Sequence, residues 1–330
     1  MSLFYINSKI IIFVSLIIYI IVISFSNNYI HHKYRNIINV AYAFDKNYHY
    51  ITHVSMKSIM LSQNNDTFIN FYILVSNITL KQKNVINRIS FEHKNCKIEF
   101  FDMGNQFKEY HLANNIWSTA NFYRLRLPEL LKDVKKIIYL DTDTLIYKDL
   151  SKIYNYNIEG KYFIGMLEYK EAKFFIRNNV SFNNFINTGV MLCNLEELKA
   201  GNISYKIIDF IQKNNNNLFY PVNEPTNLIT YTKNDYFSPE DVVIGFCNIE
   251  EAFNYYDYKK DVNKNLVIKA YKDPYIYHYI MLVKPWNGIH YKNNLLCVDP
   301  FVRFYEVARK TSYFYEILKM FPIRIQKLKL

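Results

Sequence analysis

Glycine and proline are scarce in this chain, with only 7 and 8 of them among 330 residues. No stretch is rich enough in either residue to form a flexible or extended linker. The chain also lacks an internal repeat of fixed period. Because nothing marks a domain boundary inside residues 36–320, we expect one globular domain there.

Cysteine is also sparse, with four residues that lie tens of positions apart and form no Cys-x-x-Cys pair. This spacing excludes a zinc ribbon and a dense disulfide framework. We expect the cysteines to be buried thiols. A bridge between Cys247 and Cys297 stays open as an alternative if the domain lies in an oxidising compartment.

The chain has a formal net charge of +11 but no basic run interleaved with aromatic residues at helical or strand spacing. Zinc-finger and RNA-binding motifs are absent as well. Lys, Asn, Ile, Tyr and Phe are enriched together, which is the composition that an AT-rich genome produces. We therefore interpret the charge as a solvated lysine-rich surface and expect no nucleic acid partner.

One long apolar run lies near the N-terminus, where residues 10–25 read IIIFVSLIIYIIVISF without a charge. As a helix it would be about 24 Å long, close to the thickness of a bilayer core. No Ala-x-Ala-like cleavage site follows, which favours a single-pass anchor over a signal peptide. The basic residues on its two sides balance, so the orientation stays open. We expect the inner membrane in a bacterium, or a type II protein of the Golgi and secretory pathway in a eukaryote.

These features divide the chain into five segments. They are a short tail at 1–9, a transmembrane anchor at 10–26, a linker at 27–36, a globular domain at 37–320 and a basic tail at 321–330. We expect the basic tail to lie on a surface or to be disordered.

Apolar strands alternate with amphipathic segments in the first half of the domain. The pattern predicts strands at 37–44, 68–75, 97–101 and 137–140, with helices at 49–62, 79–91 and 119–131. In the less regular second half it predicts a strand at 185–195 and helices at 196–212, 221–231 and 301–320. Such alternation is typical of an α/β fold whose parallel sheet is covered on both faces.

Two aspartates follow the fourth predicted strand, in KKIIYLDTDTLIYKDL. In an extended segment Asp141 and Asp143 point to the same side, so their carboxylates can bind one cation. The alternative is that both only cap the turn after the strand. Ligands collect beyond the carboxyl ends of parallel strands, so we expect Asp45, after the first strand, to face the same crevice.

A third ligand for such a cation comes from the stretch YIYHYIMLVKPWNG. The neutral imidazole of His278 is a competent metal ligand beside two carboxylates. A lone histidine among aromatic residues also fits a buried core position, so the sequence around it leaves both roles open.

Four separated motifs together resemble glycosyltransferase family 8. In the family's order they are VAYAFDKNYHYITHVSMKSI at 40–59, Asp141-Thr-Asp143, Asn187-Thr-Gly-Val-Met-Leu with Asn194-Leu195, and His278 with Lys284-Pro-Trp286. The resemblance spans residues 38–290. It implies a GT-A fold, with a Rossmann-like, mostly parallel sheet, and a retaining, metal-dependent transfer of sugar from a UDP-sugar.

The resemblance also implies a role for each matching residue. Manganese would be held by Asp141, Asp143 and His278. The UDP part of the donor would contact Ala43, Asp45, Asn47, Thr142 and Lys284, the last at a phosphate oxygen. The donor sugar would lie near Arg124, Asn187, Asn223 and Glu224.

Two positions depart from the family's pattern. Val222 begins the stretch VNEPTN where many relatives read Asp-Gln-Asp before a helix, so the first acid is missing. Met281 replaces a glycine that lies close to the diphosphate in relatives. Glu224 also has an alternative role, as a carboxylate near the N-terminus of a helix.

We therefore expect a membrane-anchored hexosyltransferase that moves glucose or galactose from a UDP-hexose to a glycan, lipid-linked or protein-linked acceptor. The alternative from another class is a catalytically silent GT-A domain that binds a nucleotide or a glycan. A third hypothesis is a basic peripheral protein whose anchor and tail bind acidic lipids. The acceptor cannot be read from the sequence, because acceptor pockets are built from variable loops.

Overall fold

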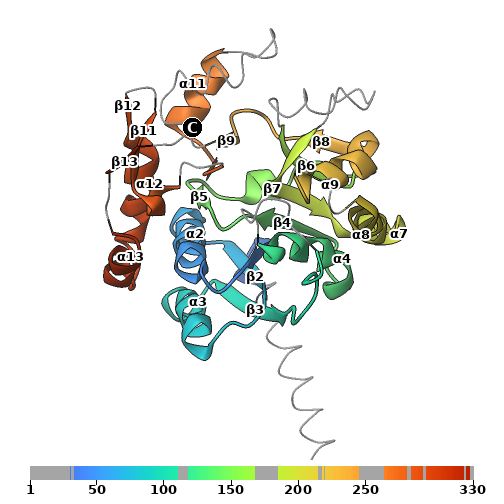
Figure 1. Ribbon diagram of the computed structural model, residues 1–330, viewed down its shortest axis with the longest axis horizontal. Helices are drawn as coiled ribbons and strands as arrows, with labels where there is room; N and C mark the ends of the chain where they lie inside the picture. The colour runs from blue at the N-terminus through green and yellow to red at the C-terminus, as the bar shows by residue number, and fades with distance from the viewer. Residues whose placement is uncertain are drawn as a thin grey trace, which may run out of the picture.

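A seven-stranded sheet forms the centre of the computed structural model (Figure 1). Its strand order is β3 (Cys96–Asp102), β2 (Thr67–Val75), β1 (Asn36–Phe44), β4 (Lys136–Leu140), β7 (Ile186–Asn194), β6 (Phe163–Leu167) and β8 (Asn234–Tyr236). The structure describes residues 30, 33–110, 118–167, 185–214, 218, 220–244, 264–280, 284–292, 295–322 and 325–327.

The first four strands form the parallel half of the sheet. β1 pairs in parallel with both β2 and β4, and β2 pairs in parallel with β3. β7 then runs antiparallel to β4 and to β6. The predicted α/β class with a mostly parallel sheet is confirmed, and the carboxyl ends of β1 and β4 lie side by side at one edge.

Helices cover both faces of this sheet (Figure 1). Those of the first half are α2 (His49–Ser62), α3 (Leu80–Glu92), the 3-10 helix η1 (Thr119–Arg126), α4 (Leu127–Leu130) and α5 (Ser151–Tyr154). Those of the second half are α7 (Leu195–Ala200), α8 (Ile203–Asn214), α9 (Asn223–Thr230), η4 (Tyr231–Lys233), α11 (Lys264–Lys272), η5 (Pro285–Asn287), α12 (Asp299–Ala308) and α13 (Phe314–Met320).

Alternate side chains of β1 enter different cores, as the pleat of a strand requires. Val40 and Tyr42 pack in a core that includes Met56 and Ile59 of α2. Ala41 packs on the other face, in a core with residues of η1, α4, α7 and α8. This burial on both faces explains why β1 and β2 are continuous apolar runs.

A small second sheet joins distant parts of the chain beside the carboxyl edge. β5 (Thr144–Ile146) follows β4 almost at once, and β10 (Ile276–His278) pairs antiparallel with it and parallel with β9 (Val242–Ile244). In this register His278 lies opposite Thr144. The pairing therefore carries residue 278 to the position next to Asp143.

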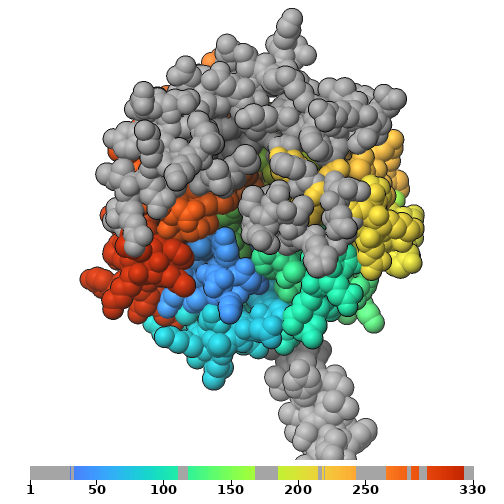
Figure 2. All heavy atoms as spheres, in the orientation of Figure 1, coloured from blue at the N-terminus to red at the C-terminus, as the bar shows by residue number. Residues whose placement is uncertain are grey.

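The C-terminal part packs against the start of the domain. α12 contacts α2, and their aromatic and aliphatic side chains share a third core. Figure 2 shows these C-terminal residues, in red, beside the blue N-terminal ones. A third small sheet of β12 (Leu295–Cys297), β11 (Ile289–Lys292) and β13 (Ile325–Lys327) completes this part.

Three predicted helices are wrong in form. The helix expected at 119–131 is the 3-10 helix η1 followed by the single turn α4, with Pro128 in the first turn of α4, where it is tolerated. The helix expected at 196–212 is interrupted at Asn202, whose φ of 51° lies in the left-handed region. The helix expected at 301–320 is broken between α12 and α13, where the Thr311 hydroxyl donates to Ala308 O.

Part of the basic tail is ordered. Residues 325–327 form β13, which pairs in parallel with β11. Backbone pairing at the edge of a sheet therefore replaces the disorder that was one of our two expectations for this stretch.

The predicted membrane anchor at 10–26 and the tail at 1–9 lie outside the described residues, as does part of the linker. Within the described part of the chain, no helix is both long and apolar enough for a membrane span. Cys96 and Cys193 are buried free thiols, as expected. Cys297 is disulfide-bonded, so the expectation of a thiol is wrong there, and Cys247, its partner in the alternative left open above, lies outside the described residues.

Candidate functional site

The two aspartates of the D-x-D motif lie in the short connection between β4 and β5. The Asp141 N–H donates to Gly189 O of β7 at 2.7 Å, and the Thr144 hydroxyl donates to Asp141 O at 2.8 Å. The Tyr279 N–H donates to Asp143 O at 2.8 Å. Bonds from β7, β5 and the residue that follows β10 (Ile276–His278) thus fix the backbone from which both carboxylates project.

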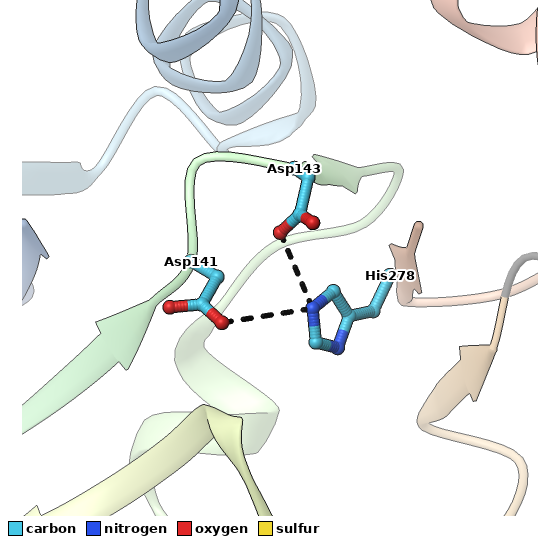
Figure 3. Close-up of side chains that lie close together, drawn as sticks. All are labelled: Asp141, Asp143 and His278. Carbon is cyan, nitrogen blue, oxygen red and sulfur yellow. Dashed lines mark ion pairs between the residues drawn. The ribbon is translucent and has the colours of Figure 1, made fainter. Parts of the chain in front are cut away.

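His278 reaches these carboxylates from the end of β10. Its Nε2 lies 3.3 Å from Asp143 Oδ1 and 3.9 Å from Asp141 Oδ2. Figure 3 shows this nitrogen turned towards both carboxylates. One ligand atom from each of the three residues lies within 4.8 Å of the others, so a single cation can contact all three.

The site fits a divalent cation in its shape as well as in its ligands. A Cβ added at Gly189 would lie 2.4 Å from His278 Cε1 and 2.5 Å from Asp141 Oδ2. Only glycine leaves this space free between the carboxylate and the imidazole. Asp143 Oδ1 is buried and makes no hydrogen bond to any described residue. Two carboxylates and an imidazole suit a cation such as Mn²⁺.

Arg124 holds Asp141 from behind. Its guanidinium donates to Asp141 Oδ1 at 2.8 Å and to Thr188 O at 2.5 Å, and it lies 4.2 Å from the centre of the Tyr139 ring. Burial alone would lower the pKa of Arg124, but Asp141 raises it above its ordinary value, so the guanidinium stays charged. The Tyr139 hydroxyl also donates to Asp141 Oδ1, at 3.0 Å. One Asp141 oxygen is therefore held by the protein while Oδ2 faces the candidate cation position.

Asp143 has a different cationic partner, the ammonium of Lys284, which also donates to Tyr279 O. Burial alone would raise the pKa of Asp143, but Lys284 and His278 lower it well below its usual value. Asp143 is therefore a carboxylate over the whole physiological pH range.

The residues predicted to contact the nucleotide lie around the end of β1. Ala43 is buried and is the second-last residue of β1. Asp45 Oδ1 accepts a hydrogen bond from the Asn47 N–H at 2.8 Å. Burial, followed by the charges of Asp143 and Asp45, raises the pKa of Tyr48, which precedes α2. The parallel pairing of β1 with β4 brings the end of β1 to the side of the carboxylate pair. Thr142 is buried between the two aspartates.

The residues predicted to lie near the sugar are connected through β7 and α9. Asn187 Oδ1 accepts from the Gly189 N–H at 2.8 Å, and the Thr188 hydroxyl donates to Asn223 Oδ1. Glu224 is buried in the first turn of α9.

Of the two residues that depart from the family's pattern, the structure describes only Val222. Val222 is buried in the core between the sheet and α8, so no acid faces the site from this position. Met281 lies outside the described residues.

Gly189, Tyr139 and Thr188 were not singled out from the sequence. A usable signal existed for the first, because a glycine inside a strand often marks a close approach by another group. That signal is stronger in a chain with only 7 glycines. Thr188 and Gly189 both lie in the motif at 187–192, which drew attention to Asn187 alone, whereas Tyr139 lies inside an apolar strand and carries no local signal.

Comparisons with known proteins agree with this geometry. The family model of glycosyl transferase family 8 matches residues 39–290. A putative glycosyltransferase of Haemophilus influenzae is 25% identical over 255 residues, which cover 74% of this chain and 72% of that protein. The lipopolysaccharide 1,2-glucosyltransferase of Escherichia coli K12 is 22% identical over 83% of this chain and 78% of its own length.

A solved structure shares the fold over nearly all of its length. The galactosyltransferase LgtC, in complex with donor and acceptor sugar analogues, superimposes with a TM-score of 0.68 at 18% identity, covering 83% of this chain and 96% of that one. The family match covers most of the chain and includes every residue of the candidate site. This chain therefore belongs to glycosyl transferase family 8 and has its GT-A fold.

Proposed function

We propose that this protein is a metal-dependent, retaining hexosyltransferase that moves glucose or galactose from a UDP-sugar to a glycan or glycoconjugate acceptor. The observation that carries the proposal is the convergence of Asp141, Asp143 and His278 at the carboxyl edge of the sheet. Relatives named as a lipopolysaccharide glucosyltransferase and a galactosyltransferase support a hexose donor and a glycan or lipid-linked acceptor.

Asp141, Asp143 and His278 would hold Mn²⁺, with Asp141 kept in orientation by Arg124. When bound, the cation would neutralise the negative charge that develops on the departing UDP. Lys284 would add a positive charge at a phosphate oxygen.

The donor sugar would lie beside Asn187, Asn223 and Glu224. Retention requires the acceptor hydroxyl to arrive on the face from which UDP leaves, by front-face attack or through a covalent intermediate. The Thr188 hydroxyl donates a hydrogen bond to Asn223 Oδ1 and so connects β7 with the start of α9.

For the cellular location we propose a single membrane anchor at residues 10–26. The uncharged apolar run supports it. The protein would lie in the inner membrane of a bacterium, or as a type II protein of the Golgi and secretory pathway of a eukaryote. Alkaline extraction of membranes should leave the full chain in the pellet and release a variant without residues 1–29.

The activity is tested by measuring UDP release from UDP-glucose and UDP-galactose by the full chain, with Mn²⁺ or with a chelator. We expect release that requires the metal and falls by about 100-fold or more in Asp143→Asn. Asp273→Asn is the matched control, because Asp273 pairs with Lys148 at 2.6 Å on the surface. Release that is independent of metal, or equal in the two variants, would refute the metal-dependent mechanism.

The second candidate is a catalytically silent GT-A domain that binds a nucleotide or a glycan. The burial of Val222, which leaves this position without an acid, favours it. In that case UDP would bind in the presence of Mn²⁺, but no sugar bond would break with any common UDP-hexose.

A further inference from the structure

The two carboxylates of the site are neutralised by two cations of different kinds. Asp141 pairs with the guanidinium of Arg124 at 2.8 Å, and Asp143 pairs with the ammonium of Lys284. In the absence of metal, the charges of these four groups therefore balance. This balance matters because a buried carboxylate without a counter-charge is costly.

Arg124, the partner of Asp141, is held in one position by its surroundings. Its side chain is only 4% exposed, and its nitrogens also donate to Asn121 O at 2.9 Å and Asn121 Oδ1 at 3.0 Å. Together with the bond to Thr188 O and the Tyr139 ring, these contacts hold the guanidinium on both sides. Moving Arg124 away from Asp141 would break several buried hydrogen bonds at once.

Lys284, the partner of Asp143, can exchange this carboxylate for another hydrogen-bond acceptor. Lysine carries a compact charge on a flexible four-carbon stem, which can turn to a new acceptor without moving the backbone. The side chain is 19% exposed, and its backbone immediately precedes the short helix η5. Its ammonium donates to Asp143 Oδ2, the oxygen beside the one that faces His278, and to one backbone acceptor, Tyr279 O. Arg124, by contrast, has four hydrogen-bond acceptors besides Asp141.

A divalent cation and this ammonium would therefore compete for one carboxylate. A cation between Asp141, Asp143 and His278 would place two positive charges close to Lys284 in a partly buried site, where repulsion is only weakly screened. The diphosphate of a nucleotide would then supply new acceptors for the ammonium beside the metal.

We propose that Lys284 is a built-in counter-cation of Asp143, which the metal displaces on binding and which thereby becomes available to the diphosphate. This inference rests on the proposed function, since it assumes that the site holds a metal. It implies that metal binds before the nucleotide, and that Lys284 weakens metal binding in the free protein while it strengthens nucleotide binding in the metal-loaded protein.

The test is a titration of the full chain with Mn²⁺. The electron paramagnetic resonance signal of free Mn²⁺ measures how much metal is bound, without any turnover. Lys284→Met should bind Mn²⁺ about tenfold more tightly than the wild type when no nucleotide is present. With saturating Mn²⁺, the same variant should bind UDP about tenfold more weakly.

Lys148→Met is the matched control, because it removes the same charge from a lysine that pairs with Asp273 at 2.6 Å outside the site. Its Mn²⁺ and UDP affinities should equal those of the wild type. Thermal unfolding checks that each variant is folded, and Lys284→Gln replaces Lys284→Met if the latter does not fold.

The outcomes separate the two proposals. Equal or weaker Mn²⁺ binding by Lys284→Met, with a wild type that does bind Mn²⁺, would overturn the counter-cation role and leave the proposed function intact. No Mn²⁺ binding by either the wild type or Lys284→Met would overturn both. Tighter binding by Lys148→Met as well would show a general effect of charge and would also overturn the specific role of Lys284.

Discussion

Gly189 shows how a single absent side chain makes the site possible. Its position opposite Asp141 brings β7 so close to the carboxylate and the imidazole that a methyl group would overlap both. The chemistry of Asp141, Asp143 and His278 could be predicted from residue type and family resemblance. The space between them could not, because it depends on the approach of two strands that are about fifty residues apart in the chain.

The first prediction concerns this space. Gly189→Ala should lower the affinity for Mn²⁺ by about 100-fold, because Asp141 and His278 must move apart to admit the Cβ. The melting temperature should change little, since alanine is acceptable in a strand and the groups that move are side-chain ends. Manganese titration and thermal unfolding measure both effects.

Gly201→Ala serves as its control. The added Cβ would approach Ile203 Cγ1 and the Tyr162 hydroxyl at 3.0 Å, between α7 and α8 and away from the metal ligands. Normal Mn²⁺ affinity in Gly189→Ala would mean that the space beside Gly189 is not part of the metal site.

Among the elements, the buried strands were predictable and the helix ends were not. β1 and β2 are long apolar runs, and the helix predicted from residue 79 begins there, because Thr79 caps α3 in a capping box with Gln82. The interruptions at Asn202 and Thr311 lie inside segments whose apolar spacing continues, so periodicity alone hides them. The three-residue pairing of β5 with β10 is too short for any pattern, and it is the contact that delivers His278.

The second prediction concerns the contact of α9 with β7. The fully buried Asn227 amide accepts from the Ile186 N–H at 2.8 Å and donates to Ile186 O at 2.8 Å and Asn223 O at 2.7 Å. Asn227→Leu should lower the free energy of unfolding by about 2–4 kcal/mol, because it leaves buried backbone groups of Ile186 unpaired. Denaturant unfolding measures this loss.

Asn214→Leu provides the comparison, because its amide donates to Phe210 O at 2.9 Å at the partly exposed end of α8. We expect a loss of about 0.5 kcal/mol or less for this variant. Similar losses in the two variants would argue against a special role of Asn227 in holding α9 on the sheet.

For the molecule as a whole, stability should depend on how α2 contacts the C-terminal part. His53 of α2 is completely buried. Its ring packs edge-on against the ring of Tyr313, with 5.2 Å between the ring centroids. Burial lowers the pKa of His53 to about 4, although Glu92 opposes the shift. A histidine among aromatic residues is thus a neutral core residue here, which is the role that the sequence left open for His278.

The third prediction is a loss of stability in acid. The unfolded chain has an ordinary histidine pKa near 6.5, so it binds a proton between pH 6.5 and 4 while the folded protein does not. The contribution of His53 is therefore present above about pH 6.5 and is lost as the pH falls, by about 3 kcal/mol at pH 4.

Denaturant unfolding of the wild type and of His53→Leu across this range measures the effect. The variant should lack this part of the pH dependence. The same slope in both proteins would mean that other groups, such as Glu92 in its salt bridges with Lys57 and Arg88, control the acid response.

The central claim is that a divalent cation is held between Asp141, Asp143 and His278 and binds UDP. The most direct measurement is a crystal structure of the protein with Mn²⁺ and UDP, in which anomalous scattering locates the metal. We predict one strong peak about 2.2 Å from ligand atoms of all three residues, with a diphosphate oxygen as a further ligand. Bound UDP without such a peak, or a peak that does not contact His278, would contradict the account.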